Sequence, residues 1–247
     1  MEALRDEVTR RLLDARRDRM DAWVGAEGDG EPEAGSPRAR LQFHFANLDD
    51  FPLADGIPLR YRPWRLYHFS PDNARDAVAF IEGGDASTLF LHGAVGTGKT
   101  SLAAAILHAW RWSGGGCNSE CPTNCGASRR EVGLFLPAYE AAARLRNLDR
   151  CEEAMAEWGG ARLLVLDDIG ANRATPHVTE QLLFLLQRRY DNCAKTVATS
   201  NLGLPGIEQM LGERAASRLQ EGILIELTGG DKRGGGERPL PEQGKQD

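Results

Sequence analysis

The sequence predicts an α/β fold, in which a parallel sheet lies between two layers of helices. Three observations carry this prediction. A glycine-rich loop follows an apolar, β-branched run of strand length, residues 87–92, and precedes a strongly helix-forming segment. A second apolar run, residues 161–166, ends in two consecutive acids, Asp167 and Asp168. Strand-like runs alternate with helical segments over the rest of the core, as they do in βαβ units.

The loop has the chemistry of a phosphate-binding site. Residues 93–100 read GAVGTGKT, which fits the pattern of a glycine, four residues and Gly-Lys-Thr. Glycines let backbone N–H groups approach phosphate oxygens, and the following helix directs the positive end of its dipole at the same anion. We expect Lys99 to reach the β- and γ-phosphates of ATP and the Thr100 hydroxyl to ligate Mg²⁺. The predicted ATP-binding residues are Gly93, Ala94, Val95, Gly96, Thr97, Gly98, Lys99, Thr100 and Ser101.

Asp167 and Asp168 are the predicted metal-binding and catalytic acids. Paired acids at the end of a buried strand have little structural purpose, because like charges repel. In ATPases with this loop, the first acid holds the Mg²⁺ shell and the second polarises the attacking water. Asp168 is one methylene shorter than the usual glutamate, so we expect slow hydrolysis of ATP to ADP and phosphate. Asn201, at the tip of the predicted strand 195–200, is expected to point at the γ-phosphate or the water.

Length, charge and cysteine content restrict the class of protein. A chain of 247 residues can form one α/β domain with appendages. It has no window of about 18 apolar residues and a charged N-terminus, so we expect neither a membrane span nor a secretory signal. Five cysteines indicate a reducing compartment, and we expect a cytoplasmic protein. Because the formal charge is −6, DNA contacts require a local basic patch.

The chain divides into four predicted segments. Residues 1–24 form an amphipathic helix, which either packs on its own domain or docks in a groove of a partner protein. Residues 25–40 are rich in Gly, Pro and Glu and form a flexible linker. Residues 41–228 form the ATPase core, and residues 229–247 form a disordered tail.

Residues 113–130 form a glycine-rich insertion that contains Cys117, Cys121 and Cys125. The even spacing of these thiols is compatible with a metal site. Zinc sites are usually four-coordinate, however, and no fourth ligand stands at a recognisable spacing. We therefore prefer a surface loop with free thiols, and the sequence alone does not decide whether the loop holds a metal.

Three arginines cluster on a predicted helix, residues 138–150, which precedes a second predicted helix, residues 151–158. They are Arg144, Arg146 and Arg150. A solvated helix face explains the cluster, and contacts with the phosphates of a nucleic acid strand are the alternative.

The order of motifs resembles the core of AAA+ ATPases, a group of P-loop NTPases. The run TSNL at residues 199–202, followed by LGERAASRL at residues 211–219, resembles bacterial helicase loaders of the DnaC/DnaI type. The transposition helper ATPase IstB shares much of it, and LDDIG at residues 166–170 is similar to the acid-strand motif of this group. The resemblance covers about residues 70–233. It implies a three-layer fold with strands in the spatial order 5-1-4-3-2 and no C-terminal helical lid.

The same resemblance implies a role for two arginines. Arg218 would be the arginine finger, which projects into the nucleotide of a neighbouring subunit and stabilises transition-state charge. Arg214, one helical turn earlier, is the other candidate. An ordinary ion pair on the helix surface is the alternative for either residue.

The implied activity is ATP hydrolysis in DNA replication, with the loading of a replicative helicase onto single-stranded DNA and self-association through Arg218. Two alternatives remain: an IstB-like transposition helper on duplex DNA, and a binding module that is switched by nucleotide and turns over slowly. The sequence identifies neither the partner, nor the number of subunits, nor the form of DNA.

Overall fold

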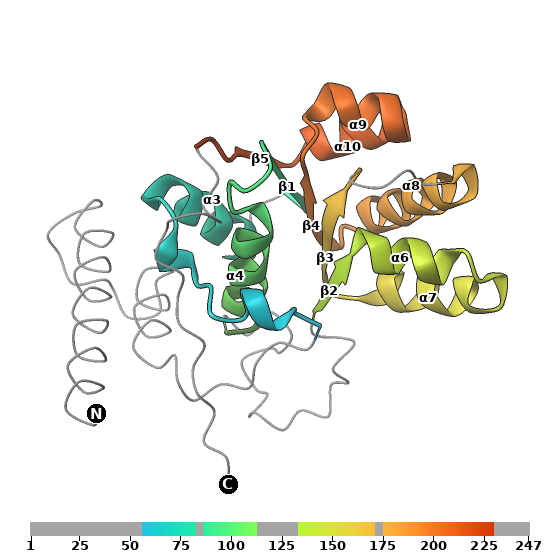
Figure 1. Cartoon of the computed structure of the whole chain (residues 1–247), viewed down its shortest axis with the longest axis horizontal. Helices are drawn as coiled ribbons and strands as arrows, with labels where there is room; N and C mark the ends of the chain where they lie inside the picture. The colour runs from blue at the N-terminus through green and yellow to red at the C-terminus, as the bar shows by residue number, and fades with distance from the viewer. Residues whose placement is uncertain (1–55, 83–85, 113–132, 171–174, 230–247) are drawn as a thin grey trace, which may run out of the picture.

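The computed structural model describes residues 56–82, 86–112, 133–170 and 175–229 (Figure 1). Within these ranges five strands form one sheet in the spatial order β2-β3-β4-β1-β5, and each neighbouring pair is parallel. Read from the other edge, the order is 5-1-4-3-2, so the predicted fold class and strand order are confirmed. No helix in these ranges is long and apolar enough to cross a membrane.

Four of the five strands are almost fully buried, as expected for a parallel sheet covered by helices on both faces, whereas the edge strand over residues 223–226 keeps Leu224 and Glu226 exposed. In β1, Leu89 and Leu91 belong to the core on one side of the sheet and Phe90 to the core on the other. The strands are β1 (Thr88–His92), β2 (Leu134–Pro137), β3 (Leu163–Ile169), β4 (Lys195–Ser200) and β5 (Ile223–Glu226).

Helices cover both faces of the sheet and complete three layers (Figure 1). The first face packs against two helices and two short 3₁₀ turns: α3 (Pro71–Glu82), α4 (Lys99–Trp112), η2 (Leu59–Tyr61) and η3 (Leu66–His68). The second face packs against five helices of the described ranges: α6 (Ala138–Leu145), α7 (Leu148–Gly160), α8 (Pro176–Asp191), α9 (Leu204–Leu211) and α10 (Glu213–Gln220).

The helix predicted over residues 138–150 is wrong in its extent. It ends at Leu145, and α7 begins at Leu148 and absorbs the second predicted helix. The break lies at Asn147, whose side chain accepts a hydrogen bond from the backbone N–H of Asp149 at 3.2 Å. Asparagine favours the N-cap position, because its side-chain oxygen satisfies an N–H group that the first helical turn leaves free.

A fully buried arginine on α8 ties the second helical layer to the sheet. The guanidinium of Arg189 donates to the carbonyl oxygens of Trp158, Ala161 and Lys195, at 2.7, 2.8 and 2.6 Å. Its Nε donates to the Thr196 hydroxyl at 2.9 Å. Burial lowers the pKa of Arg189 to about 10, so the group stays charged at neutral pH. Carbonyl and hydroxyl oxygens surround this cation, and the hydrogen bonds connect the end of α7 to the start of β4.

Several sequence predictions lie outside the described residues. These are the helix over residues 1–24, the linker 25–40, the insertion 113–130 and the tail beyond Gly229, together with the predicted absence of a lid. Cys117, Cys121 and Cys125 fall in this part of the chain, so the preferred surface loop with free thiols stays a prediction and the question of a metal site stays open. Within the described ranges, no group of three or more His, Cys, Asp or Glu residues could hold a metal ion.

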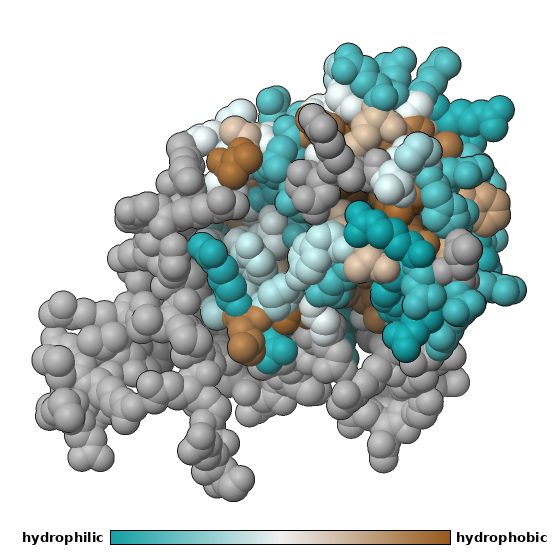
Figure 2. All heavy atoms as spheres, turned by 45° about the vertical axis from the view of Figure 1, so that its right-hand side comes forward, coloured by the Kyte–Doolittle hydropathy of each residue, from teal (hydrophilic) through white to brown (hydrophobic). Residues whose placement is uncertain are grey.

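The surface carries its large hydrophobic side chains singly. On the face in Figure 2, hydrophobic residues form small separate groups among hydrophilic ones. The most exposed large hydrophobics in the described ranges come from different elements and loops: Leu59, Val95, Tyr139, Phe184 and Leu224. Single exposed apolar residues are normal on a protein surface, so they do not by themselves indicate a docking face.

Candidate nucleotide site

The glycine-rich loop joins β1 to α4 at the carboxyl edge of the sheet. Gly93 has φ +141°, and a Cβ at this position would lie 2.2 Å from the carbonyl oxygen of Leu227. This close approach follows from pairing beyond β5, where the Leu227 N–H donates to the His92 carbonyl at 2.8 Å. Gly96 and Gly98 also have positive φ, at 86° and 100°. Side chains at these positions would therefore change the path of the loop.

Lys99 lies at the mouth of this loop, as the first residue of α4, and is only 6% exposed. Its Nζ donates to the carbonyl oxygens of Gly93 and Ala94, at 2.8 and 2.7 Å. The Thr97 hydroxyl donates to the same Ala94 carbonyl at 2.9 Å. A cation, a helix N-terminus and a turn of glycines thus meet at one place, which is an environment that favours a bound anion.

The remaining predicted loop residues occupy both sides of the turn. Val95 is 55% exposed at the tip of the loop, whereas Ser101 is buried in the first turn of α4. Thr100 precedes Ser101, and its side chain lies beside Asp167, where it lowers the pKa of that carboxyl group. The loop and the acidic end of β3 therefore lie next to each other.

A register shift in β3 sets the positions of the two acids. Between Leu166 and Ile169 the pairing of β3 with β4 is irregular, and Asp167 and Asp168 lie in this interval. Asp168 has φ +64°, in the left-handed region. Aspartate tolerates this region better than most residues, and such backbone positions cluster at functional sites. An irregularity of this kind re-aims side chains at the end of a strand.

Thr199 of β4 connects the two acids. Its hydroxyl accepts a hydrogen bond from the Asp168 N–H and donates one to Asp167 Oδ1, each at 2.7 Å. Thr199 is 1% exposed, so both bonds are shielded from water. We did not predict a role for this residue from the sequence. A threonine inside a strand is an ordinary β-former, and only the position of Asp167 beside it indicates more.

Asp167 is a buried carboxyl group, 7% exposed. Burial raises its pKa above the usual value of 3.8, and the charge of Asp168 acts in the same direction. Hydrogen bonds from Thr199 and Thr100 and the charge of Lys99 oppose this rise. Carboxylate and hydroxyl oxygens are ligands that Mg²⁺ accepts in proteins. Asp167 and Thr100 therefore fit a magnesium site, because a cation there would compensate the buried charge.

Asn201 lies beside the second acid. Its Nδ2 donates to Asp168 Oδ1 at 3.0 Å, and this contact holds the carboxylate in one orientation. The structure thus gathers Lys99, Thr100, both acids and Asn201 at the carboxyl edge of the sheet. Parallel strands in open α/β folds place their ligand sites at this edge.

The structure does not bring Arg218 and Arg214 to this edge. Arg218 lines a cleft of about 420 Å³, together with Thr88, the first residue of β1, and Gly222, which precedes β5. Its guanidinium lies 4.9 Å from the ring centre of Tyr190, and its Nη1 donates to the Arg214 carbonyl at 3.2 Å. The Arg214 side chain is exposed. The length of β1, about 15 Å, separates the cleft from the loop, so Arg218 does not reach the loop of its own chain.

The arginine cluster on α6 and α7 divides into two kinds of residue. Arg144 forms an ion pair with Glu157 at 2.7 Å and lies 4.9 Å from the ring centre of Trp158. It joins the two helices to each other. Arg146 and Arg150 are exposed at the turn between them, and their contact with nucleic acid stays a prediction.

No protein-family model matches this chain, and no curated protein matches it either. Solved structures do. The DnaC helicase loader aligns with a TM-score of 0.54 and 23% identity, over 68% of this chain and 99% of that one. The structure of DnaI aligns with a TM-score of 0.52 and 24% identity, over 69% and 90%. The replication initiator DnaA bound to AMPPCP and single-stranded DNA aligns with a TM-score of 0.55 and 19% identity.

The chain spans about half of the DnaA structure, 51%, and nearly all of the DnaC structure. Sequence identities at this level show a shared fold, and the activity has to be argued from the residues of the site. The similarity to these structures agrees with the strand order of the sheet. The chain therefore has the AAA+ fold, similar to that of DnaC and DnaI.

Proposed function

We propose that this chain is an AAA+ ATPase of DNA replication that loads a replicative helicase onto single-stranded DNA. The observation that carries the ATPase part is that the buried carboxyl group of Asp167 lies beside Thr100 and Lys99 of the phosphate-binding loop. The loop and the acids are therefore parts of one site. The loader part is supported by the similarity to a helicase loader along 99% of that protein's solved chain.

In this proposal each residue of the site has a separate role. Lys99, the loop N–H groups and the N-terminus of α4 bind the β- and γ-phosphates. Thr100 and Asp167 hold Mg²⁺, which when bound neutralises charge on the phosphates. Asp168 orients the attacking water and accepts its proton, while Asn201 keeps the Asp168 carboxylate in place.

Arg218 supplies the remaining positive charge from a second copy of the chain. Among the described residues it forms no ion pair, and its Nη1 donates to the backbone carbonyl of Arg214. Because it lies at the amino edge of its own sheet, we propose that it acts on the nucleotide of a neighbour.

The test of nucleotide binding compares the wild type with Lys99→Ala and Asp167→Asn. We expect Lys99→Ala to lose ATP, because its loop lacks the cation, and Asp167→Asn to lose the dependence of binding on Mg²⁺. Arg146→Ala, which removes an exposed charge outside the phosphate-binding loop, is the matched control and should bind normally. Full retention of ATP by Lys99→Ala would contradict the proposed site.

The test of loading is co-purification with the replicative helicase, with and without ATP, in the presence of single-stranded or duplex DNA. We expect ATP-dependent association with the helicase and a preference for single strands. An ATP-binding protein that ignores the helicase under every condition would refute the loader, and assembly on duplex DNA alone would favour a transposition helper.

A further inference from the structure

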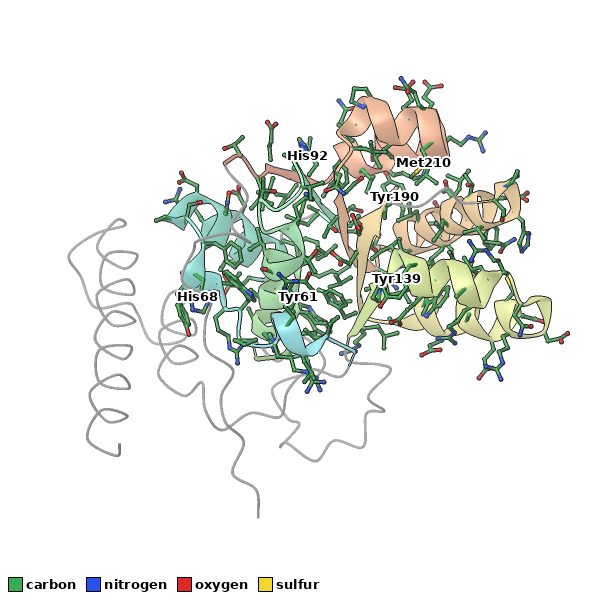
Figure 3. The ribbon with its side chains drawn as sticks, in the orientation of Figure 1. Tyr61, His68, His92, Tyr139, Tyr190 and Met210 are labelled. Atoms are coloured by element: carbon green, nitrogen blue, oxygen red, sulfur yellow. The ribbon has the colours of Figure 1, made fainter. Side chains whose placement is uncertain are left out.

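Arg218 is held by an aromatic ring instead of a carboxylate. Its guanidinium lies 4.9 Å from the ring centre of Tyr190, at the end of α8, and its Nη1 bonds to the carbonyl one turn earlier in α10. Figure 3 marks Tyr190 between α8 and the pair α9–α10. A guanidinium stacked on a ring loses little of its positive charge, whereas a salt bridge would neutralise it.

The Tyr190 ring is itself fixed from the α10 side. Its hydroxyl donates to the carboxylate of Glu221, the C-cap of α10, and Ser217 donates to the other oxygen of that carboxylate at 3.4 Å. The hydrogen bond to Glu221 raises the pKa of Tyr190, so the hydroxyl keeps its proton at neutral pH. The ring, the carboxylate and the helix carrying Arg218 therefore form one connected unit.

An arginine that acts on a phosphate in another subunit must meet two requirements. Its long side chain must be held in one direction, because otherwise ordering costs entropy when the neighbour arrives. Its charge must also stay uncompensated until that moment. A tyrosine face meets the first requirement. Asp191 and Glu221 line the same cleft as Arg218, and neither forms an ion pair with it among the described residues, so its charge is not locked in a salt bridge.

We infer that Tyr190 is a positioning residue for Arg218, which it holds in the orientation that serves the triphosphate of a neighbouring copy. The inference rests on the proposed function, in which Arg218 acts between subunits. It assigns Tyr190 no contact with nucleotide. Loss of the ring should therefore slow hydrolysis without weakening ATP binding in the same chain.

The experiment compares Tyr190→Leu, which removes the aromatic face, with Tyr190→Phe, which keeps the face and removes the bond to Glu221. We expect kcat of Tyr190→Leu to fall roughly tenfold with KM for ATP unchanged. Tyr190→Phe should stay within about threefold of the wild type, because the stacking surface remains. Thermal unfolding of each variant shows whether the fold is intact.

Mixing separates positioning from a merely structural role. In a mixture of Tyr190→Leu with Lys99→Ala, the second variant supplies an intact Arg218 to the intact loop of the first, so activity should return. Arg218→Ala mixed with Lys99→Ala is the reference. If Tyr190→Leu is fully active alone, or is slow and not rescued where Arg218→Ala is rescued, the inference is wrong and the proposed function stands. If Arg218→Ala alone hydrolyses ATP normally, the shared site of the proposed function fails instead.

Discussion

Replacing Thr199 with valine removes one buried hydroxyl and leaves the shape of the side chain nearly unchanged. The substitution leaves the Asp168 N–H without its acceptor and removes one of the hydrogen bonds to the Asp167 carboxylate. A buried donor left unpaired costs about 1–3 kcal/mol, and a hydrogen bond to a charged group contributes about 1.5–3 kcal/mol. Because Thr100 still bonds to Asp167, we expect the free energy of unfolding to fall by roughly 3 kcal/mol at neutral pH.

The size of this loss should depend on pH. Burial raises the pKa of Asp167 above 3.8, and the Thr199 bond opposes the rise, so valine raises the pKa further. Between the unfolded and folded pKa values the folded chain binds more protons than the unfolded chain. The contribution of Asp167 to stability therefore falls as pH rises through this window. In Thr199→Val the folded pKa lies further above the unfolded pKa. The difference in free energy of unfolding between the variant and the wild type should therefore grow from acid to neutral pH.

Urea unfolding followed by tryptophan fluorescence at about pH 3.5, below the unfolded pKa of an aspartate, and at about pH 8 measures both effects. Thr199→Ser is the matched control, because it keeps the hydroxyl and loses only a methyl group, at a cost of about 1 kcal/mol. Equal stability of the valine and serine variants, or a difference that does not change with pH, would refute the reasoning. Retention of ATP should also require more Mg²⁺ in Thr199→Val.

Three further predictions concern other buried or strained groups. Burial and the charges of nearby arginines lower the pKa of His108 from 6.5 to about 3. Between pH 6.5 and 5 only the unfolded chain therefore takes up this proton, and the free energy of unfolding should fall by about 2 kcal/mol. Urea titrations of His108→Leu should lack this loss, and the same dependence of stability on pH in the variant would contradict the prediction. Arg189→Met leaves buried carbonyl oxygens without donors and should lower the free energy of unfolding by about 4 kcal/mol. Arg188→Met, at an exposed position, is the control and should cost less than about 0.5 kcal/mol. Similar losses in the two variants would show that the hydrogen bonds of Arg189 contribute little to stability. Asp168→Asn keeps an oxygen that can accept the hydrogen bond from Asn201, and asparagine also tolerates positive φ. We therefore expect normal ATP binding and hydrolysis at least about 100-fold slower, measured as phosphate release. Phosphate release at the wild-type rate would show that Asp168 has no role in the mechanism.

The strands and helices of the core follow from local sequence. Residues 195–200 have the predicted bounds, because a short β-branched run is a strong local signal for a strand. The spatial order of the strands is not local, and we took it from the resemblance to AAA+ proteins. The break at Asn147 was missed because good helix formers on both sides hide a single capping residue.

The candidate site was predictable where parallel strands end. Lys99 and Thr100 meet the two acids because the loop follows β1 and the acids lie at the end of β3, and parallel strands end at a common edge. The role of Thr199 was not predictable, because it depends on a register shift in the neighbouring strand. That shift results from how two strands pair, and neither strand shows it alone.

The hydrogen bond that fixes the ring beside Arg218 joins Tyr190 to a residue 31 positions later, so no sequence window contains both ends. The separation of the two edges of the sheet has a further consequence for the proposed mechanism. The loop and the acids lie at one edge and Arg218 at the other, and β1 is a rigid, buried strand between them. No rotation of the Arg218 side chain spans about 15 Å, so a single copy holds both parts of the site without being able to use them together. In the proposed mechanism a second copy places its amino edge against the carboxyl edge of the first and completes the set of charges. The proposal therefore makes hydrolysis a property of the assembly.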